Sequence, residues 1–247
     1  MELGFIALLV AVFFFAGLVK GVLGIGMPTI LVGILTLFLD PREAIALILI
    51  ALIATNLRQA LRGEPILTVL KRYAIYCFIG TIGIFIVAYL GASVPIPALL
   101  IAVGLTMILF GASNLFLTMP TIAKRFDGLA QAIAGSLSAI MGGLTGIWGP
   151  PAAAYLTSKG LSKDAMVQAM GVIFFIHSIP LTAGFIASGD YTLRDAILGS
   201  AVLIPCLGAV FIGENIRARM NLAQFTRAFM IMFILLGFNL IRRGIFG

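Results

Sequence analysis

Long stretches without a charged residue alternate with short charged segments along this chain. There is no Asp, Glu, Lys or Arg in residues 3–19, 21–39, 73–123, 128–158 and 165–189. A helix that crosses a bilayer needs about 20 mostly apolar residues. The pattern therefore predicts an all-α, polytopic membrane protein.

Glycine and proline divide the longer stretches into separate helices. The segment 91–97 contains Gly91, Pro95 and Pro97 and cannot continue a helix, so it ends one span and begins another. Full spans are predicted from residue 3 and near 44–61, 73–90, 97–118, 128–146, 165–188, 194–213 and 223–242. Two segments, 28–39 and 150–158, begin at a proline and are too short to cross alone. The pattern fits about ten helices, or six full spans plus two re-entrant hairpins, and it does not separate these counts.

Composition and charge exclude a water-soluble protein and suggest an orientation. Only 10% of the residues are charged, whereas an average soluble domain has about 25%. Lys and Arg exceed Asp and Glu by 16 to 9, and cytoplasmic loops of membrane proteins collect such residues, so the excess does not indicate nucleic acid. The clusters lie at 58–72, 124–125, 159–163 and 217–227. Alternating spans place all of them in the cytoplasm and both chain ends outside, and only Arg242 and Arg243 disagree.

The chain contains an internal repeat. Gly21-x2-Gly24-Ile25-x2-Pro28 recurs 122 residues further on, as Gly143-x2-Gly146-Ile147-x2-Pro150. We therefore expect a first membrane repeat over residues 1–122 and a second over 123–247. Each half holds an odd number of crossings under either helix count, so the second repeat is inverted relative to the first, which is typical of transporters.

The two Gly-rich breaks are the first candidates for a binding site. A proline in the first turn starts a helix, and the free N–H groups at a helix N-terminus attract anions. Two such ends, brought together by inverted symmetry, would form a site for a small anion. The alternative is that these glycines only permit close helix packing. The candidates are Gly21, Gly24, Gly26 and Pro28 in the first break and Gly143, Gly146, Gly149 and Pro150 in the second.

The same segments carry a family resemblance. Residues 21–28, 55–60 with Gly63, 143–150 and 161–171 resemble, in this order, the sulfite exporter TauE/SafE family of bacterial and archaeal membrane transporters. The resemblance implies a multi-pass protein of a prokaryotic cell membrane that moves sulfite, sulfonates or related organosulfur anions. One departure is Pro150-Pro151-Ala152, where the family commonly has a Pro-Tyr pair.

Polar side chains inside the spans are further candidates. His177, the only histidine, lies at the centre of the uncharged run 165–189, where it either binds an oxyanion, carries a proton or is a neutral packing residue. The amides of Asn56, Gln59 and Gln168 either contact the anion or join helices. Lys20, Arg58 and Trp148 are three more candidates for contact with the anion. The alternative is that Lys20 snorkels to the interface, that Arg58 only ends its helix and that Trp148 is an interfacial residue.

The remaining expectations concern function. All nine carboxylates lie at segment ends or in loops, so no Asp or Glu is expected to carry protons in mid-membrane. Passive or potential-driven export of a small anion is the favoured function, and an anion channel or, less favoured, an intramembrane hydrolase is the alternative. We expect no metal, no cofactor and no nucleic-acid partner. The partners are the anion and the lipid bilayer, and a homodimer is left open.

Overall fold

The computed structural model describes residues 3–116, 121–217 and 222–246, and this part of the chain is helical without any β-strand. It confirms the all-α fold. The α-helices are α1 (Leu3–Leu23), α2 (Met27–Leu35), α3 (Pro41–Ala60), α4 (Ile66–Arg72), α5 (Ala74–Leu90), α6 (Ile96–Phe116), α7 (Asp127–Thr145), α8 (Gly149–Thr157), α9 (Lys163–Ser188), α10 (Leu193–Ala201), α11 (Leu203–Arg217) and α12 (Leu222–Phe246).

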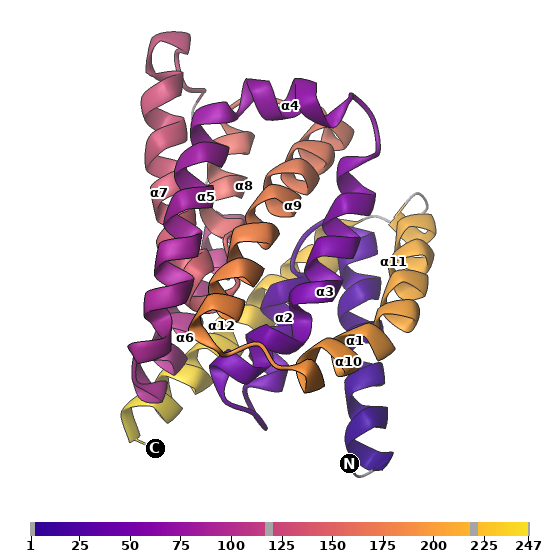
Figure 1. Cartoon of the computed structure of the whole chain (residues 1–247). Helices are drawn as coiled ribbons and strands as arrows, with labels where there is room; N and C mark the ends of the chain where they lie inside the picture. Colours follow the sequence, from indigo (N-terminus) through magenta and orange to yellow (C-terminus); the bar gives the residue numbers. More distant parts are fainter. Residues whose placement is uncertain (1–2, 117–120, 218–221, 247) are drawn as a thin grey trace.

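Seven of the described helices are long and apolar enough to cross a membrane, and the bent pair α10–α11 brings the number to eight. These spans confirm a polytopic membrane protein. The short helix α4 lies across one end of the bundle, and both chain ends lie at the opposite end (Figure 1). We call the first end the α4 end. We call the other the Arg42 end, because Arg42 lies there in the first turn of α3.

The two short apolar segments form the short helices α2 and α8. Each has nine residues, which rise about 13 Å in a helix and cannot cross a hydrocarbon core of about 30 Å. Pro28 and Pro150 stand in the first turns, where a missing N–H costs no hydrogen bond. The prediction of two short helices that begin at a proline is correct.

Two details of the predicted spans are wrong. The predicted span 194–213 is two helices that meet at 40° around Val202. Pro205 explains the break, because it has no N–H to bond the carbonyl of Ala201 and its ring crowds that carbonyl. The helix α4 was not predicted, since only Val69 of its seven residues is buried and the segment has no apolar face of useful length.

The most extensive helix contacts join early helices to late ones, in the pairs α1–α11, α5–α7, α3–α9 and α6–α12. Glycines permit close approach. Gly21 of α1 faces Gly213 of α11, and a Cβ added to Gly104 of α6 would lie 2.5 Å from the carbonyl oxygen of Gly237 in α12. Helices α3 and α9 form the centre, with 67% of their most apolar window buried against 22% in α12.

Arg242 and Arg243, the two positive residues that disagree with the predicted orientation, have hydrogen-bond partners at the Arg42 end. Arg243 donates a 2.6 Å hydrogen bond to the carbonyl oxygen of Thr36, the residue that ends α2, and Arg242 donates to Asn239 on its own helix. A positive side chain at a helix C-terminus satisfies free carbonyls. The expected cytoplasmic residue Arg219 lies outside the described residues.

Candidate functional site

A lysine and an asparagine meet inside the bundle. Lys20 lies in the last turn of α1 and is only 4% exposed, and its Nζ donates a hydrogen bond to the Oδ1 of Asn56 on α3. Lys20 therefore does not snorkel to the interface. It forms no ion pair with any carboxylate in the described ranges. A buried lysine whose partner is a neutral amide keeps an unneutralised positive charge when protonated.

A small cavity of about 30 Å³ lies beside Lys20. Three positively charged side chains and one carboxylate line it, together with small and apolar residues. The lining residues are Lys20, Gly21, Gly24, Thr55, Gln59, Arg62, Val167, Val210, Glu214 and Arg217. Six of them were not predicted as site residues, namely Thr55, Arg62, Val167, Val210, Glu214 and Arg217. The arginines were visible in the sequence, but only as orientation signals.

Glu214 holds two arginines at the mouth of this cavity. Its Oε2 accepts a 2.8 Å hydrogen bond from Arg58 and a 2.7 Å hydrogen bond from Arg62. The predicted candidate Arg58 thus ends its helix at the α4 end and forms an ion pair with α11. The Arg62 side chain is 52% exposed, so this side of the cavity reaches solvent.

Gly21 and Gly24 of the first Gly-rich break line the cavity, and the second break has a matching left-handed glycine, Gly146, elsewhere in the bundle. Gly24 has φ +79° and its N–H bonds the carbonyl of Lys20 at 2.7 Å, whereas Gly146 has φ +68° and its N–H bonds the carbonyl of Gly142 at 2.8 Å. This left-handed conformation strains other residues. Gly24 packs on Val167 of α9, and Gly146 packs on the N-terminal half of α3. The two glycines therefore do not line one cavity.

A pair of phenylalanine rings connects the starts of the short helices. Gly26, the N-cap of α2, lies against Phe233, and Gly149 at the start of α8 lies against Phe110. The two ring centroids are 5.6 Å apart. The helix ends that were expected to share an anion are thus joined by aromatic contacts, and the charged groups cluster instead beside Gly24.

Two other predicted glycines serve helix packing. A Cβ on Gly21 would overlap the backbone of α11, and a Cβ on Gly143 would lie 2.6 Å from the Cβ of Val87 on α5. Gly21 also lines the cavity, whereas Gly143 does not. The packing explanation, left open by the sequence, accounts for both positions.

The predicted glutamines fasten α3 to its neighbours. Gln59 donates to the carbonyl oxygens of Gly24, at 3.1 Å, and Val167, at 2.7 Å. Gln168 donates to the carbonyl of Glu64 and accepts from the N–H of the same residue at 3.0 Å. Gln59 lines the cavity while it braces the first break, and Gln168 closes the turn after α3.

His177 lies in a second polar cluster, enclosed by aromatic rings. It is fully buried, it stacks on Tyr76 at a centroid distance of 5.5 Å, and its ring lies edge-on to Trp148 at 6.2 Å. The Tyr76 hydroxyl shares a hydrogen bond with Ser138 of α7. Neither ring nitrogen of His177 has a hydrogen-bond partner within the described part of the chain. Trp148 is 1% exposed and is therefore not an interfacial residue.

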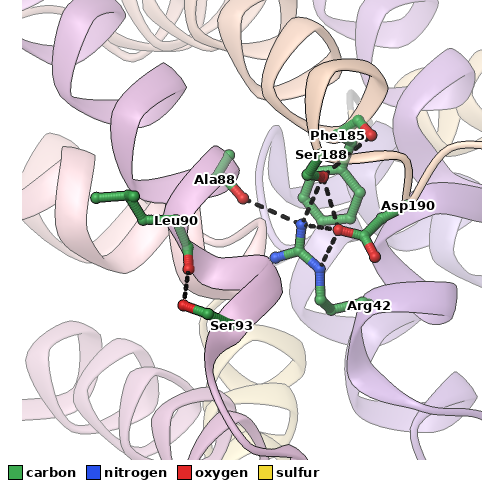
Figure 2. Close-up of polar contacts among 7 residues, drawn as sticks. All are labelled: Arg42, Ala88, Leu90, Ser93, Phe185, Ser188 and Asp190. Atoms are coloured by element: carbon green, nitrogen blue, oxygen red, sulfur yellow. Dashed lines mark hydrogen bonds and ion pairs between the residues drawn. The ribbon is translucent and has the colours of Figure 1, made fainter.

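Arg42 joins three helices at the opposite end of the bundle (Figure 2). Its Nε donates to Asp190 at 2.7 Å, and its Nη2 donates to the carbonyl of Ala88 at 3.0 Å and to Ser188 at 3.2 Å. The guanidinium lies 4.2 Å from the centroid of the Phe185 ring. One side chain thus joins the start of α3 to the ends of α5 and α9.

The charged groups are arranged for an anion rather than for a metal. No group of three or more His, Cys, Asp and Glu side chains in the described ranges could hold a metal ion. The cavity at the α4 end is lined by more positive than negative side chains, and one of them, Lys20, donates a hydrogen bond to Asn56 behind it. Such an arrangement can bind a small anion through charge-assisted hydrogen bonds.

Comparison with protein families gives one match. The family described as Sulfite exporter TauE/SafE matches residues 9–240, which is nearly the whole chain. Comparisons with curated proteins and with solved structures give no match.

Proposed function

Because this chain belongs to the sulfite exporter TauE/SafE family, we propose that it exports a small sulfur-containing anion, such as sulfite or a sulfonate, across a prokaryotic plasma membrane. Members of this family are membrane transporters and not enzymes, so the hydrolase alternative is dropped. The proposal therefore concerns the substrate, the site and the direction of transport.

The Lys20–Asn56 pair at the cavity is the observation that carries this proposal. Lys20 is buried, has a neutral partner and lies among Arg62, Arg217 and the amide of Gln59. Ionisable residues at membrane depth are rare and mark substrate pathways. A sulfur oxyanion would supply the negative charge that Lys20 lacks, and the amides would donate to its remaining oxygens.

We further propose that two inverted repeats, 1–122 and 123–247, surround this pathway. The supporting observations are the matched backbone of Gly24 and Gly146 and the matched helix pairs. Under this proposal α1–α11 corresponds to α7–α5, while α3–α9 and α6–α12 lie on the axis. Such repeats are common in transporters that expose one site alternately to the two sides.

The distribution of charges supports export as the direction of transport. Arg62, Lys71, Arg72 and Lys159 gather at the α4 end (Figure 1), and positive loops favour the cytoplasm. The cavity then faces the cytoplasm, from which an exporter must collect its substrate. The Arg42 cluster closes the outer end in this conformation.

The test is export of radiolabelled sulfite from proteoliposomes. Lys20→Gln is expected to remove most of the saturable flux, and Lys163→Gln, which makes the same charge change at an exposed residue, is expected to retain it. Equal flux through both folded variants would contradict the proposed site. A channel would differ by non-saturating flux at far higher turnover. Thermal stabilisation by sulfite, sulfonates, thiosulfate, sulfate or simple carboxylates then ranks the ligands.

A further inference from the structure

Glu214 is the one carboxylate among the charged groups at the cavity. Arg58, Arg62, Lys20 and Arg217 bring four positive side chains to its surroundings. We propose that the Glu214 carboxylate occupies the cytoplasmic anion position of the empty transporter, and that the substrate anion binds by displacing it. This inference rests on the proposed function and adds a competing residue to it.

The hydrogen bonds of Glu214 are those that a bound anion would make. A single oxygen, Oε2, accepts from both Arg58 and Arg62. The Nε of Arg58 is buried and has no hydrogen-bond partner in the part of the chain that is described. An anion with three oxygens could replace the carboxylate on both guanidinium groups and also take up this unused donor.

The available space favours this exchange. A cavity of about 30 Å³ holds about two water molecules. Sulfite has four non-hydrogen atoms and gains room when the carboxylate leaves. When the Glu214 side chain turns away, its three carboxylate atoms vacate the place that lies nearest to the arginines. The anion and Glu214 therefore compete for the same volume and the same donors.

The backbone of Glu214 is fixed, so that only its side chain is free to leave. A Cβ on Gly21 would lie 2.9 Å from the backbone nitrogen of Glu214, and Gly213 meets α1 equally closely. This contact holds α11 against α1 directly beside Lys20. Displacement then needs a side-chain rotation and no helix movement.

A matched ion pair lies at the same end of the bundle. Glu64 accepts a 2.9 Å hydrogen bond from Arg72, and both side chains are nearly half exposed. Neither residue lines the cavity. Glu64→Gln therefore makes the same charge change as Glu214→Gln, and each substitution breaks an ion pair. Glu64→Gln does so away from the proposed anion position.

The first measurement is equilibrium binding of radiolabelled sulfite to the purified full-length protein. Glu214→Gln is expected to bind about tenfold more tightly than the parent, a change of about 1.4 kcal/mol. Glu64→Gln is expected to stay within about twofold, as exposed pairs contribute little. Unchanged or weaker binding by folded Glu214→Gln, and by Glu214→Ala as the second variant, overturns the inference.

The second measurement separates this inference from the substrate assignment. Cys77 and Cys206, which are free and buried, are replaced by Ala, and Thr55 in the cavity is replaced by Cys. Sulfonatoethyl methanethiosulfonate, an anion, and its trimethylammonium counterpart, a cation, are applied at the α4 end. If no variant binds sulfite, the proposed substrate is wrong. The labelling rates then still test whether an anion displaces the Glu214 carboxylate. A rise of about fivefold in the anion-to-cation rate ratio in Glu214→Gln, absent in Glu64→Gln, supports displacement. An unchanged ratio overturns it.

Discussion

The Nζ of Lys20 and the Oδ1 of Asn56 share a hydrogen bond that crosses from α1 to α3 inside the bundle. The partner of the lysine is an amide and not a carboxylate, so the contact orients the ammonium group without cancelling its charge. In a membrane segment an uncompensated charge is costly and is retained where it serves a substrate. Under the proposed function, the Lys20–Asn56 pair presents this positive charge to the transported anion.

Changing Asn56 tests whether Lys20 must stay unneutralised. Asn56→Asp is expected to keep the protein folded and to abolish sulfite binding, because the new carboxylate takes the place of the anion beside Lys20. Asn56→Ala is expected to weaken binding about 10- to 150-fold, since a hydrogen bond to a charged group contributes about 1.5–3 kcal/mol. Binding isotherms and thermal unfolding of the same samples check both. Normal sulfite affinity in Asn56→Asp would show that the anion binds elsewhere.

The left-handed glycines of the breaks should be sensitive to a single methyl group. Gly24→Ala and Gly146→Ala are each expected to lower the free energy of unfolding by about 1–2 kcal/mol, because an L-residue is strained at this φ. Gly24→Ala is the worse of the two, since its Cβ would lie 3.0 Å from Val167. Thermal denaturation in detergent measures the difference.

The control for this series comes from the structure. Gly104 of α6 is unsuitable as a control, because it packs against the backbone of α12. Gly208 of α11 has no atom within 4 Å of an added Cβ. Gly208→Ala is expected to be neutral or to stabilise by up to about 1 kcal/mol. Equal destabilisation at all three sites would contradict the strain argument.

Gly80 and His177 should compensate each other. A Cβ on Gly80 would overlap the His177 ring, so Gly80→Ala is expected to destabilise the protein. His177→Ala opens the space again, and the double variant should melt above Gly80→Ala alone. A double-mutant cycle on melting temperature measures the coupling. Additive losses of melting temperature would show that the methyl group added at position 80 does not contact the His177 ring.

The orientation predicts labelling at four loop positions. Cysteines that replace Arg62 and Lys124 should react with an impermeant thiol reagent only from the cytoplasmic side. Cysteines that replace Ser93 and Gly189 should react only from outside, because these positions end helices at the Arg42 end (Figure 1). Labelling of all four from one side would refute the inverted repeat.

No titrating carboxylate should be needed for transport. Glu43, Asp164 and Glu214 lie near helix ends, and Glu64 lies in the loop between α3 and α4. The ion pairs of Glu43 and Glu64 are partly exposed. Amide replacement of each is expected to leave substantial flux in proteoliposomes. Complete loss in one folded variant would identify a coupling residue.

The sequence predicts the spans because charge-free runs and Gly/Pro breaks are local signals. The partners of the polar residues are not local. Lys20 meets Asn56, Arg42 meets Asp190 across 148 positions, and Arg58 meets Glu214 across 156. Such pairs depend on how each helix is rotated and tilted, which a single sequence does not specify. The sequence of α1 alone is compatible with a Lys20 side chain that points toward lipid or toward the interior. The packing of α1 on α11 determines this orientation.

The close contacts of α1 with α11 and of α6 with α12 also affect how the protein is made. Helices α1 and α6 make their most extensive contacts with the last two helices of the chain, and their glycines Gly21 and Gly104 pack directly against those helices. During synthesis the first helices can insert into the bilayer but cannot complete their packing. Insertion and assembly are thus separated in time. A nascent chain that stalls before α11 exposes the unpaired packing face of α1 to lipid and to cellular proteases.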